Sequence, residues 1–144
     1  MSTVRYPGLS LVLPDSWADE TVPTFVGRRA DGFFTNIVCT RVLQGERLGV
    51  ETHARKQLAT AREALVDYRI HAEEALEHRG CRGYKVLHSF AGEEGRQVTQ
   101  LQLYLEQGEH VLVLTASAAS SAFEELRSEL EEILASVQLA ESPT

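Results

Sequence analysis

Apolar and polar positions along this chain fall into short runs that are typical of β-strands. Strand-favouring residues alternate with polar ones or form brief apolar runs, and turn-forming Gly, Pro and Asp residues separate them. The predicted strands cover residues 9–13, 21–28, 33–43, 68–76, 83–90, 97–106 and 110–116. Short turns join the last four of these segments, which predicts an antiparallel meander.

Two other segments, residues 50–66 and 121–138, carry the spacing of three and four residues that indicates an α-helix. In the second segment Ser121 precedes Glu124 by three residues, which predicts a capping box at the start of the helix. The apolar stripe is thin and Ala-rich in the first helix and larger in the second. The first stripe consists of Ala54, Leu58, Ala61 and Leu65, and the second of Phe123, Leu126, Leu130, Ile133, Leu134 and Val137.

The order of these elements is β-β-β-α-β-β-β-β-α. Runs of strands on both sides of a single helix predict the α+β class rather than a doubly wound parallel sheet. The specific expectation is an antiparallel seven-stranded sheet with two flanking helices. The 144 residues fit one domain that spans 1–144. Because two helices do not cover both faces of so wide a sheet, we expect part of its surface to stay open.

Composition excludes several functional classes. Hydrophobic residues make up 43% of the chain and charged residues 24%, which is ordinary for a globular protein and unlike a disordered one. The net charge of −7 argues against nucleic-acid binding, which needs a basic face. No apolar run reaches the ~18 residues of a membrane span, and no secretory signal is visible. We therefore expect a cytoplasmic protein without stable membrane insertion.

Motifs that carry catalysis or bind metals are missing from the sequence. The segment 80–83, Gly-Cys-Arg-Gly, lacks the Lys-Ser/Thr ending of a phosphate-binding loop. His78 and Cys81 have a ligand-like spacing, but a zinc site needs three or four ligands. The sequence therefore predicts no enzyme, no cofactor and no metal. Cys39 and Cys81 are expected to be small buried thiols in strands, with a disulfide as the alternative.

Uncharged polar residues stand on faces where an apolar core is expected. Asn36 and Thr40 share one face of their strand with Val38, and Gln100 shares a face with Gln102. One interpretation is a sheet side that faces solvent. The other is a mixed surface that receives an apolar peptide, because neutral amides and hydroxyls pair with buried polar groups without the desolvation cost of an ion. Under this second interpretation the predicted client-binding residues are Asn36, Val38, Thr40, Gln57, Ala61, Leu65, Gln100 and Gln102.

Several short motifs, taken in their order and spacing, resemble DcrB-related proteins. They are Leu11-Val12-Leu13-Pro14-Asp15-Ser16-Trp17, Asn36-Ile37-Val38-Cys39-Thr40-Arg41, Gln57-Leu58, Gly83-Tyr84, Gln100-Leu101-Gln102, Leu114-Thr115-Ala116-Ser117, Phe123 and Ile133-Leu134-Ala135-Ser136. The resemblance extends from about residue 9 to residue 139, which would form the core of a single DcrB-like domain. It implies a PsbP-like fold, in which helices flank an antiparallel sheet.

Within that family, members without a signal sequence look like the Eag chaperones of type VI secretion. The resemblance implies a homodimeric, non-enzymatic adaptor that shields the apolar N-terminal transmembrane segment of an effector. A sheet too wide for its two helices also favours a dimer, since large exposed apolar patches are uncommon on monomers. The alternative is a non-catalytic scaffold or envelope-related binding protein with the same fold.

Overall fold

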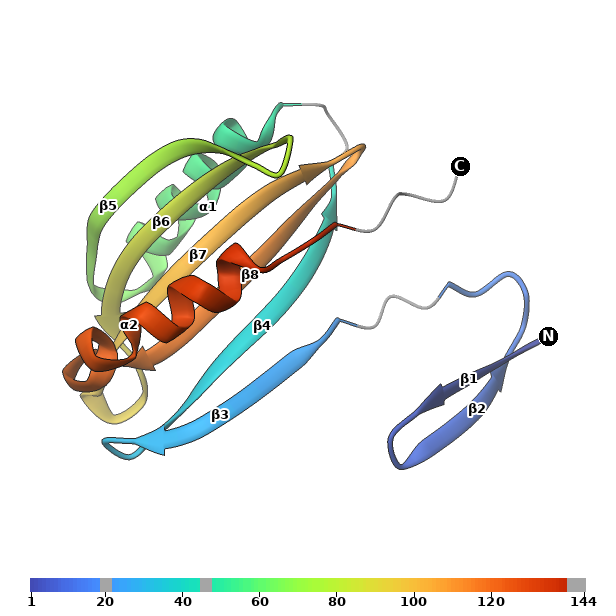
Figure 1. The fold of residues 1–144 in the computed structure, drawn as a ribbon, viewed down its shortest axis with the longest axis horizontal. Helices are drawn as coiled ribbons and strands as arrows, with labels where there is room; N and C mark the ends of the chain where they lie inside the picture. The colour runs from blue at the N-terminus through green and yellow to red at the C-terminus, as the bar shows by residue number, and fades with distance from the viewer. Residues whose placement is uncertain (19–21, 45–47, 140–144) are drawn as a thin grey trace.

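A computed structural model of the protein describes residues 1–18, 22–44 and 48–139. Within these ranges the fold contains eight strands and two α-helices (Figure 1). The strands are β1 (Ser2–Tyr6), β2 (Leu9–Leu13), β3 (Thr24–Ala30), β4 (Phe33–Leu43), β5 (Val66–His78), β6 (Cys81–Ala91), β7 (Gln97–Gln107) and β8 (His110–Ala119). The helices are α1 (Val50–Ala64) and α2 (Ser120–Ala135), and a short 3₁₀ turn covers Glu93–Gly95.

The strands form two separate sheets and not the single seven-stranded sheet that the sequence predicts. β1 and β2 pair only with each other, whereas six antiparallel strands form the main sheet in the order β3-β4-β8-β7-β6-β5. The sequence pattern does not reveal β1, and the turn at Pro7-Gly8 pairs it with β2. Gly8 has a φ of 84°, which glycine adopts without strain in such a turn. The coarser prediction, an α+β protein with two helices and an antiparallel main sheet, is confirmed.

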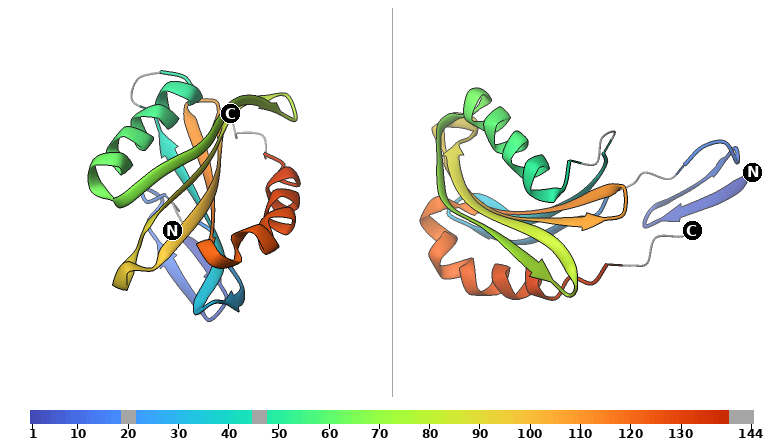
Figure 2. Two further views of the ribbon diagram at one scale, coloured as in Figure 1. Left: turned by 90° about the vertical axis from the view of Figure 1, so that its left-hand side faces the viewer. Right: turned by 90° about the horizontal axis from the view of Figure 1, so that it is seen from above.

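The two helices pack on opposite faces of the six-stranded sheet (Figure 2). Helix α2 buries its apolar stripe against side chains of β4, β7 and β8. Helix α1 buries Val50, Ala54 and Leu58 in a second cluster that includes Tyr104 of β7. Because side chains alternate along a strand, the odd-numbered residues of β7, such as Leu101, face α2 and the even-numbered ones face α1.

Helix α2 differs from its predicted form at both ends. Its N-cap is Ala119 and no side chain caps it, so the predicted capping box is wrong. The reason is that β8 runs directly into the helix, and the Ser121 hydroxyl instead donates a 2.6 Å hydrogen bond to Asp31. Along the predicted stripe, Leu134 is 2% exposed but Ile133 is 42% exposed. The sheet-facing side of the last turns is therefore centred on Leu134, and Ile133 lies at its rim.

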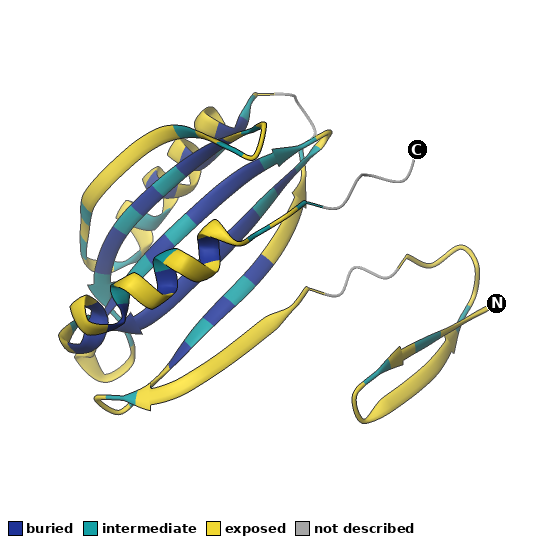
Figure 3. Cartoon of the chain, viewed as in Figure 1, coloured by how far each residue is buried: buried dark blue, intermediate teal, exposed yellow. Residues whose placement is uncertain are grey.

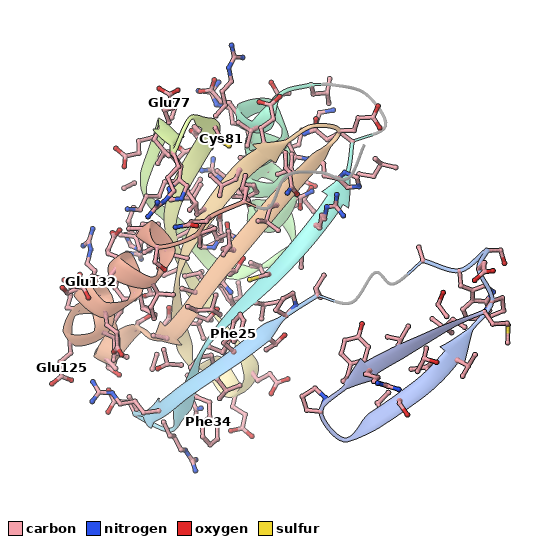
Figure 4. All side chains as sticks on the ribbon, turned by 45° about the vertical axis from the view of Figure 1, so that its right-hand side comes forward. Phe25, Phe34, Glu77, Cys81, Glu125 and Glu132 are labelled. Atoms are coloured by element: carbon pink, nitrogen blue, oxygen red, sulfur yellow. The ribbon has the colours of Figure 1, made fainter. Side chains whose placement is uncertain are left out.

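Neither helix covers the whole sheet. Helix α1 packs chiefly over β5, β6 and β7, and α2 packs chiefly over β7 and β8 on the other face. The edge strand β3 is exposed along most of its length (Figure 3). Phe25 of β3 is 59% exposed and Phe34 of β4 is 55% exposed, and both lie on this side of the molecule (Figure 4). Part of the sheet surface is therefore open, as expected.

The two cysteines are free thiols, so the disulfide alternative is wrong. Cys39 is buried in the cluster beneath α2, and desolvation raises the pKa of its thiol. Cys81 is only half-buried, because it begins β6 at a turn. Cys39 therefore matches the prediction of a small core residue better than Cys81 does.

Candidate functional site

Three rows of side chains cross the α1 face of the main sheet and continue into its open half. The strand register sets these rows, since directly opposed residues of antiparallel strands project from the same face. Each row begins on β4, passes through β8 and β7, and ends on β6. The rows are Asn36–Ser117–Gln100–His88, Val38–Thr115–Gln102–Val86 and Thr40–Val113–Tyr104–Tyr84. Five predicted client-binding residues, all those on strands, thus occupy one face.

Hydrogen bonds join three residues of the first row, Ser117, Gln100 and His88, to one another and to Tyr68 of β5, whereas the Asn36 amide donates to the Phe34 carbonyl oxygen. The Tyr68 hydroxyl of β5 lies 2.6 Å from Nδ1 of His88, and Nε2 of His88 lies 2.8 Å from Oε1 of Gln100. Nε2 of Gln100 donates to the Ser117 hydroxyl at 3.0 Å. His88 is 3% exposed, and desolvation lowers the pKa of its imidazole. The ring is therefore neutral at about pH 7, and the row carries no net charge.

The second row is held in the same way. The Tyr104 hydroxyl donates to Oε1 of Gln102 at 3.1 Å, and Nε2 of Gln102 donates to the Thr115 hydroxyl at 3.1 Å. Burial raises the pKa of Tyr104 to about 12, so its phenol is a neutral donor near pH 7. Both predicted glutamines of β7 are thus fixed in orientation by neighbours on the sheet.

Helix α1 lies beside these rows and brings the other predicted residues to the same face. The His53 ring makes an edge contact with Tyr104, with 6.2 Å between ring centroids. Gln57 follows His53 by one helical turn and so lies on the same side of the helix. Gln57 is exposed, whereas Ala61 and Leu65 are half-buried, and Leu65 is the C-cap residue. Gln57 therefore stands at the border between α1 and the open sheet.

A hollow of about 300 Å³ lies beside the middle of the first row. Gln100 and Ser117 line it together with the apolar side chains of Phe90 and Val98. Phe33, Gly92, Glu93 and Arg96 complete its lining. The surface therefore deepens where its polar side chains meet apolar walls, an arrangement suited to a group that is apolar but carries one polar atom.

The side chains of this surface on β4, β7 and β8 are neutral polar or apolar. Within residues 36–42, 98–104 and 111–117, no Asp, Glu, Lys or Arg stands on the α1 face of β4, β7 or β8. No group of three or more His, Cys, Asp or Glu side chains in the described ranges is placed to hold a metal ion. No described helix is long and apolar enough to cross a membrane.

The prediction from sequence missed several members of the surface. Thr115 and Ser117 of β8 stand between the predicted residues of β4 and β7. Their alternation with Leu114 and Ala116 was the available signal, since it places two hydroxyls on one face of a strand. His88 and Tyr68 gave no such signal, because their partnership depends on the pairing of β5 with β6.

Solved structures similar to this chain share its architecture. A Pseudomonas aeruginosa protein described as PA94, of unknown function and a putative regulator, has a TM-score of 0.77 at 19% identity, over 100% of this chain and 99% of its own. CyanoP, the cyanobacterial PsbP of Synechocystis sp. PCC 6803, has a TM-score of 0.58 at 11% identity, over 90% of this chain and 99% of its own. LpqN of Mycobacterium tuberculosis, described as involved in cell envelope biogenesis, has a TM-score of 0.51 at 15% identity, over 78% of this chain and 77% of its own. At these identities the likeness shows the fold, which is PsbP-like.

Sequence comparison gives the family. No curated protein matches the chain in sequence. The family model for DcrB, in contrast, matches residues 9–136, which is most of the chain and includes both helices, the main sheet and β2. The resemblance inferred from the short motifs is therefore confirmed at this level: the chain belongs to the DcrB family.

Proposed function

We propose that this protein is a non-catalytic adaptor that shields an apolar helix of a partner protein. In its specific form, the proposal is a chaperone for the N-terminal transmembrane segment of a type VI secretion effector, like the Eag proteins that the sequence resembles. The observation that carries it is the uncharged stretch of the α1 face on β4, β7 and β8. A sheet side that only faces solvent usually carries charged residues, so an open but uncharged surface favours a binding site.

The composition of the surface suits a membrane-segment client. Val38 is half-buried and supplies apolar area, and burial of such area contributes about 25 cal/mol per Å². Gln100 and Gln102 offer amide groups that can pair with the few polar atoms of such a helix. A charged side chain in this position would lose its hydration when the client binds, at a much larger cost.

The proposal includes a homodimer. The β1–β2 hairpin stands away from the six-stranded sheet in Figure 1, and the side chains of Leu9, Leu11 and Val12 are exposed. An isolated two-stranded hairpin is only marginally stable in water. A second copy of the chain that packed on this hairpin would bury its apolar side chains and enlarge the surface available to a client.

The second candidate function is that of a scaffold or binding protein related to the cell envelope. The description of LpqN as involved in cell envelope biogenesis favours it, since LpqN shares the fold. The two candidates differ in location and partner. The adaptor would act in the cytoplasm on a newly made effector, whereas the envelope protein would co-fractionate with the envelope.

Co-purification from the native host tests these candidates. The tagged protein is recovered from soluble and envelope fractions, and its partners are identified by mass spectrometry. The adaptor predicts a soluble complex with a protein that begins with an apolar helix. Recovery from the envelope without such a partner would favour the second candidate.

A direct test uses the purified protein and a synthetic apolar helix of about 20 residues flanked by lysines. Gln57→Leu should weaken binding of this peptide while leaving thermal stability unchanged, because Gln57 is exposed. Gln97→Leu is the matched control. Gln97 is an exposed residue of β7 and is odd-numbered, so it lies on the α2 face of the sheet. Equal effects of the two substitutions would contradict the assignment of the α1 face.

A further inference from the structure

The buried histidine of the first row sets the direction of its hydrogen bonds. Nε2 of His88 faces Oε1 of Gln100, and a carbonyl oxygen only accepts, so the ring hydrogen is on Nε2. A neutral imidazole has a single N–H, and Nδ1 must therefore accept from the Tyr68 hydroxyl. Tyr68 and His88 together keep the amide oxygen of Gln100 turned inward.

On the side of Gln100 away from His88, the consequence is a free donor. With its oxygen turned toward His88, Gln100 directs its amide nitrogen to the Ser117 hydroxyl, which accepts at 3.0 Å. The Ser117 hydroxyl keeps its own hydrogen, for which the described residues provide no acceptor. Ser117 is only 6% exposed and lines the hollow, so an acceptor that reaches this hydrogen comes from the hollow. A ligand oxygen placed there would complete the row of hydrogen bonds.

This donor lies in the hollow described above. Ser117 and Gln100 line the hollow beside Phe90 and Val98, so its polar groups are next to apolar walls. The neighbouring row has the same direction, since Gln102 accepts from Tyr104 and donates to Thr115. Both rows thus run from a tyrosine hydroxyl to a hydroxyl of β8.

We propose that the hollow receives an uncharged client side chain that carries a hydrogen-bond acceptor oxygen, and that Tyr68 and His88 are positioning residues that keep Gln100 and Ser117 as donors. This inference rests on the proposed function, because the side chain belongs to the shielded apolar helix. It adds a selectivity: among equally apolar helices, the protein prefers one with an acceptor at the position that enters the hollow.

Two peptides that differ in one atom test this preference. Both are lysine-flanked Leu/Ala helices of about 20 residues. One carries norvaline and the other O-methylserine, which has a similar shape but replaces a methylene with an acceptor oxygen. The residue is placed at four consecutive positions, so that one of them faces the hollow. At that position the wild-type protein should bind the O-methylserine peptide about 3- to 10-fold more tightly, as expected for one net hydrogen bond.

Variants of the row separate positioning from stability. Tyr68→Phe removes the donor to Nδ1 of His88. The imidazole can then change tautomer, and the side-chain amide of Gln100 can flip so that its nitrogen faces His88. The preference should then fall below about twofold, while affinity for the norvaline peptide is unchanged. A merely structural loss would weaken both peptides equally. Ser117→Ala removes the donor hydroxyl itself and should abolish the preference as well, which gives a second test should Tyr68→Phe not fold.

Thr99→Val is the matched control. The Thr99 hydroxyl lies 2.7 Å from the Ser120 hydroxyl, on the α2 face of β7 and outside the three rows. This variant should keep the wild-type preference. Equal binding of the two peptides by the wild-type protein, or an unchanged preference in both Tyr68→Phe and Ser117→Ala, overturns the inference but leaves the proposed function standing. If no apolar helix binds the wild-type protein at all, the proposed function fails and the inference with it.

Discussion

The Tyr104 hydroxyl donates a 3.1 Å hydrogen bond to the side-chain oxygen of Gln102, two residues before it on the same face of β7. Tyr104 is almost completely buried, and Gln102 is its side-chain acceptor. Gln102 in turn donates to Thr115 on the neighbouring strand. The predicted client-binding glutamine is therefore also part of the folded structure, and the two roles can be separated by substitution.

Gln102→Leu should lower the free energy of unfolding by about 1–3 kcal/mol, because it leaves the Tyr104 hydroxyl buried without an acceptor. Adding Tyr104→Phe removes the orphaned hydroxyl and should recover part of that loss. Urea unfolding of the single and double variants measures both effects. If the double variant is as unstable as the sum of the single ones, the hydrogen bond does not contribute in this way.

Leu130→Ala should destabilise the protein by about 2–5 kcal/mol, since Leu130 lies fully in the cluster beneath α2 and its loss leaves a cavity. Ile133→Ala, in the same helix, should cost less because Ile133 lies at the rim of the sheet-facing side. Denaturant unfolding compares the two. A loss below about 0.5 kcal/mol for Leu130→Ala would mean that the stripe is not core.

Local sequence pattern predicted most elements of the main sheet. The segments that became β4 to β8 are long, apolar on at least one face and bounded by turns, so their periodicity survives in the fold. β1 lacks these signals: it has five residues and pairs only with β2. The capping box failed for another reason, because continuity of β8 with α2 replaced the side-chain cap by a strand-to-helix junction at Ala119.

The candidate surface was predictable only in part. Alternation placed Asn36, Val38 and Thr40 on one face, and the same rule grouped Gln100 with Gln102. Their proximity depends on β8, which lies between β4 and β7 although it follows both in the chain. The periodicity of a single strand does not predict which strands are neighbours in the sheet. The hydrogen-bonded row that reaches Tyr68 therefore emerges only from the folded sheet.

The proposed homodimer predicts a species of twice the chain mass of 16.0 kDa in light scattering at micromolar concentration. Replacing Leu9 and Leu11 with Ser should shift the protein to the monomer, because these exposed side chains lie on one face of the hairpin. Leu43→Ser is the control, since Leu43 is exposed at the end of β4, outside the hairpin. Only a 16.0 kDa species for the wild-type protein would contradict the dimer.

Stability should fall as the pH drops through the acidic range, and His88 should account for part of the loss. Desolvation lowers the pKa of His88 in the fold, the bond to Gln100 opposes this shift, and the charge of His71 adds to the lowering. In the unfolded chain the imidazole has its ordinary pKa of about 6.5. The unfolded state therefore binds the proton more readily, so the stabilisation is complete above about pH 6.5 and is lost as the pH falls through the folded-state pKa.

Urea unfolding at about pH 7.5 and pH 5 measures this difference in stability, and His88→Gln should reduce it. The reduction should be partial, because desolvation also lowers the pKa of His53. An identical loss in the variant and the wild-type protein would exclude His88 as a source of the pH dependence.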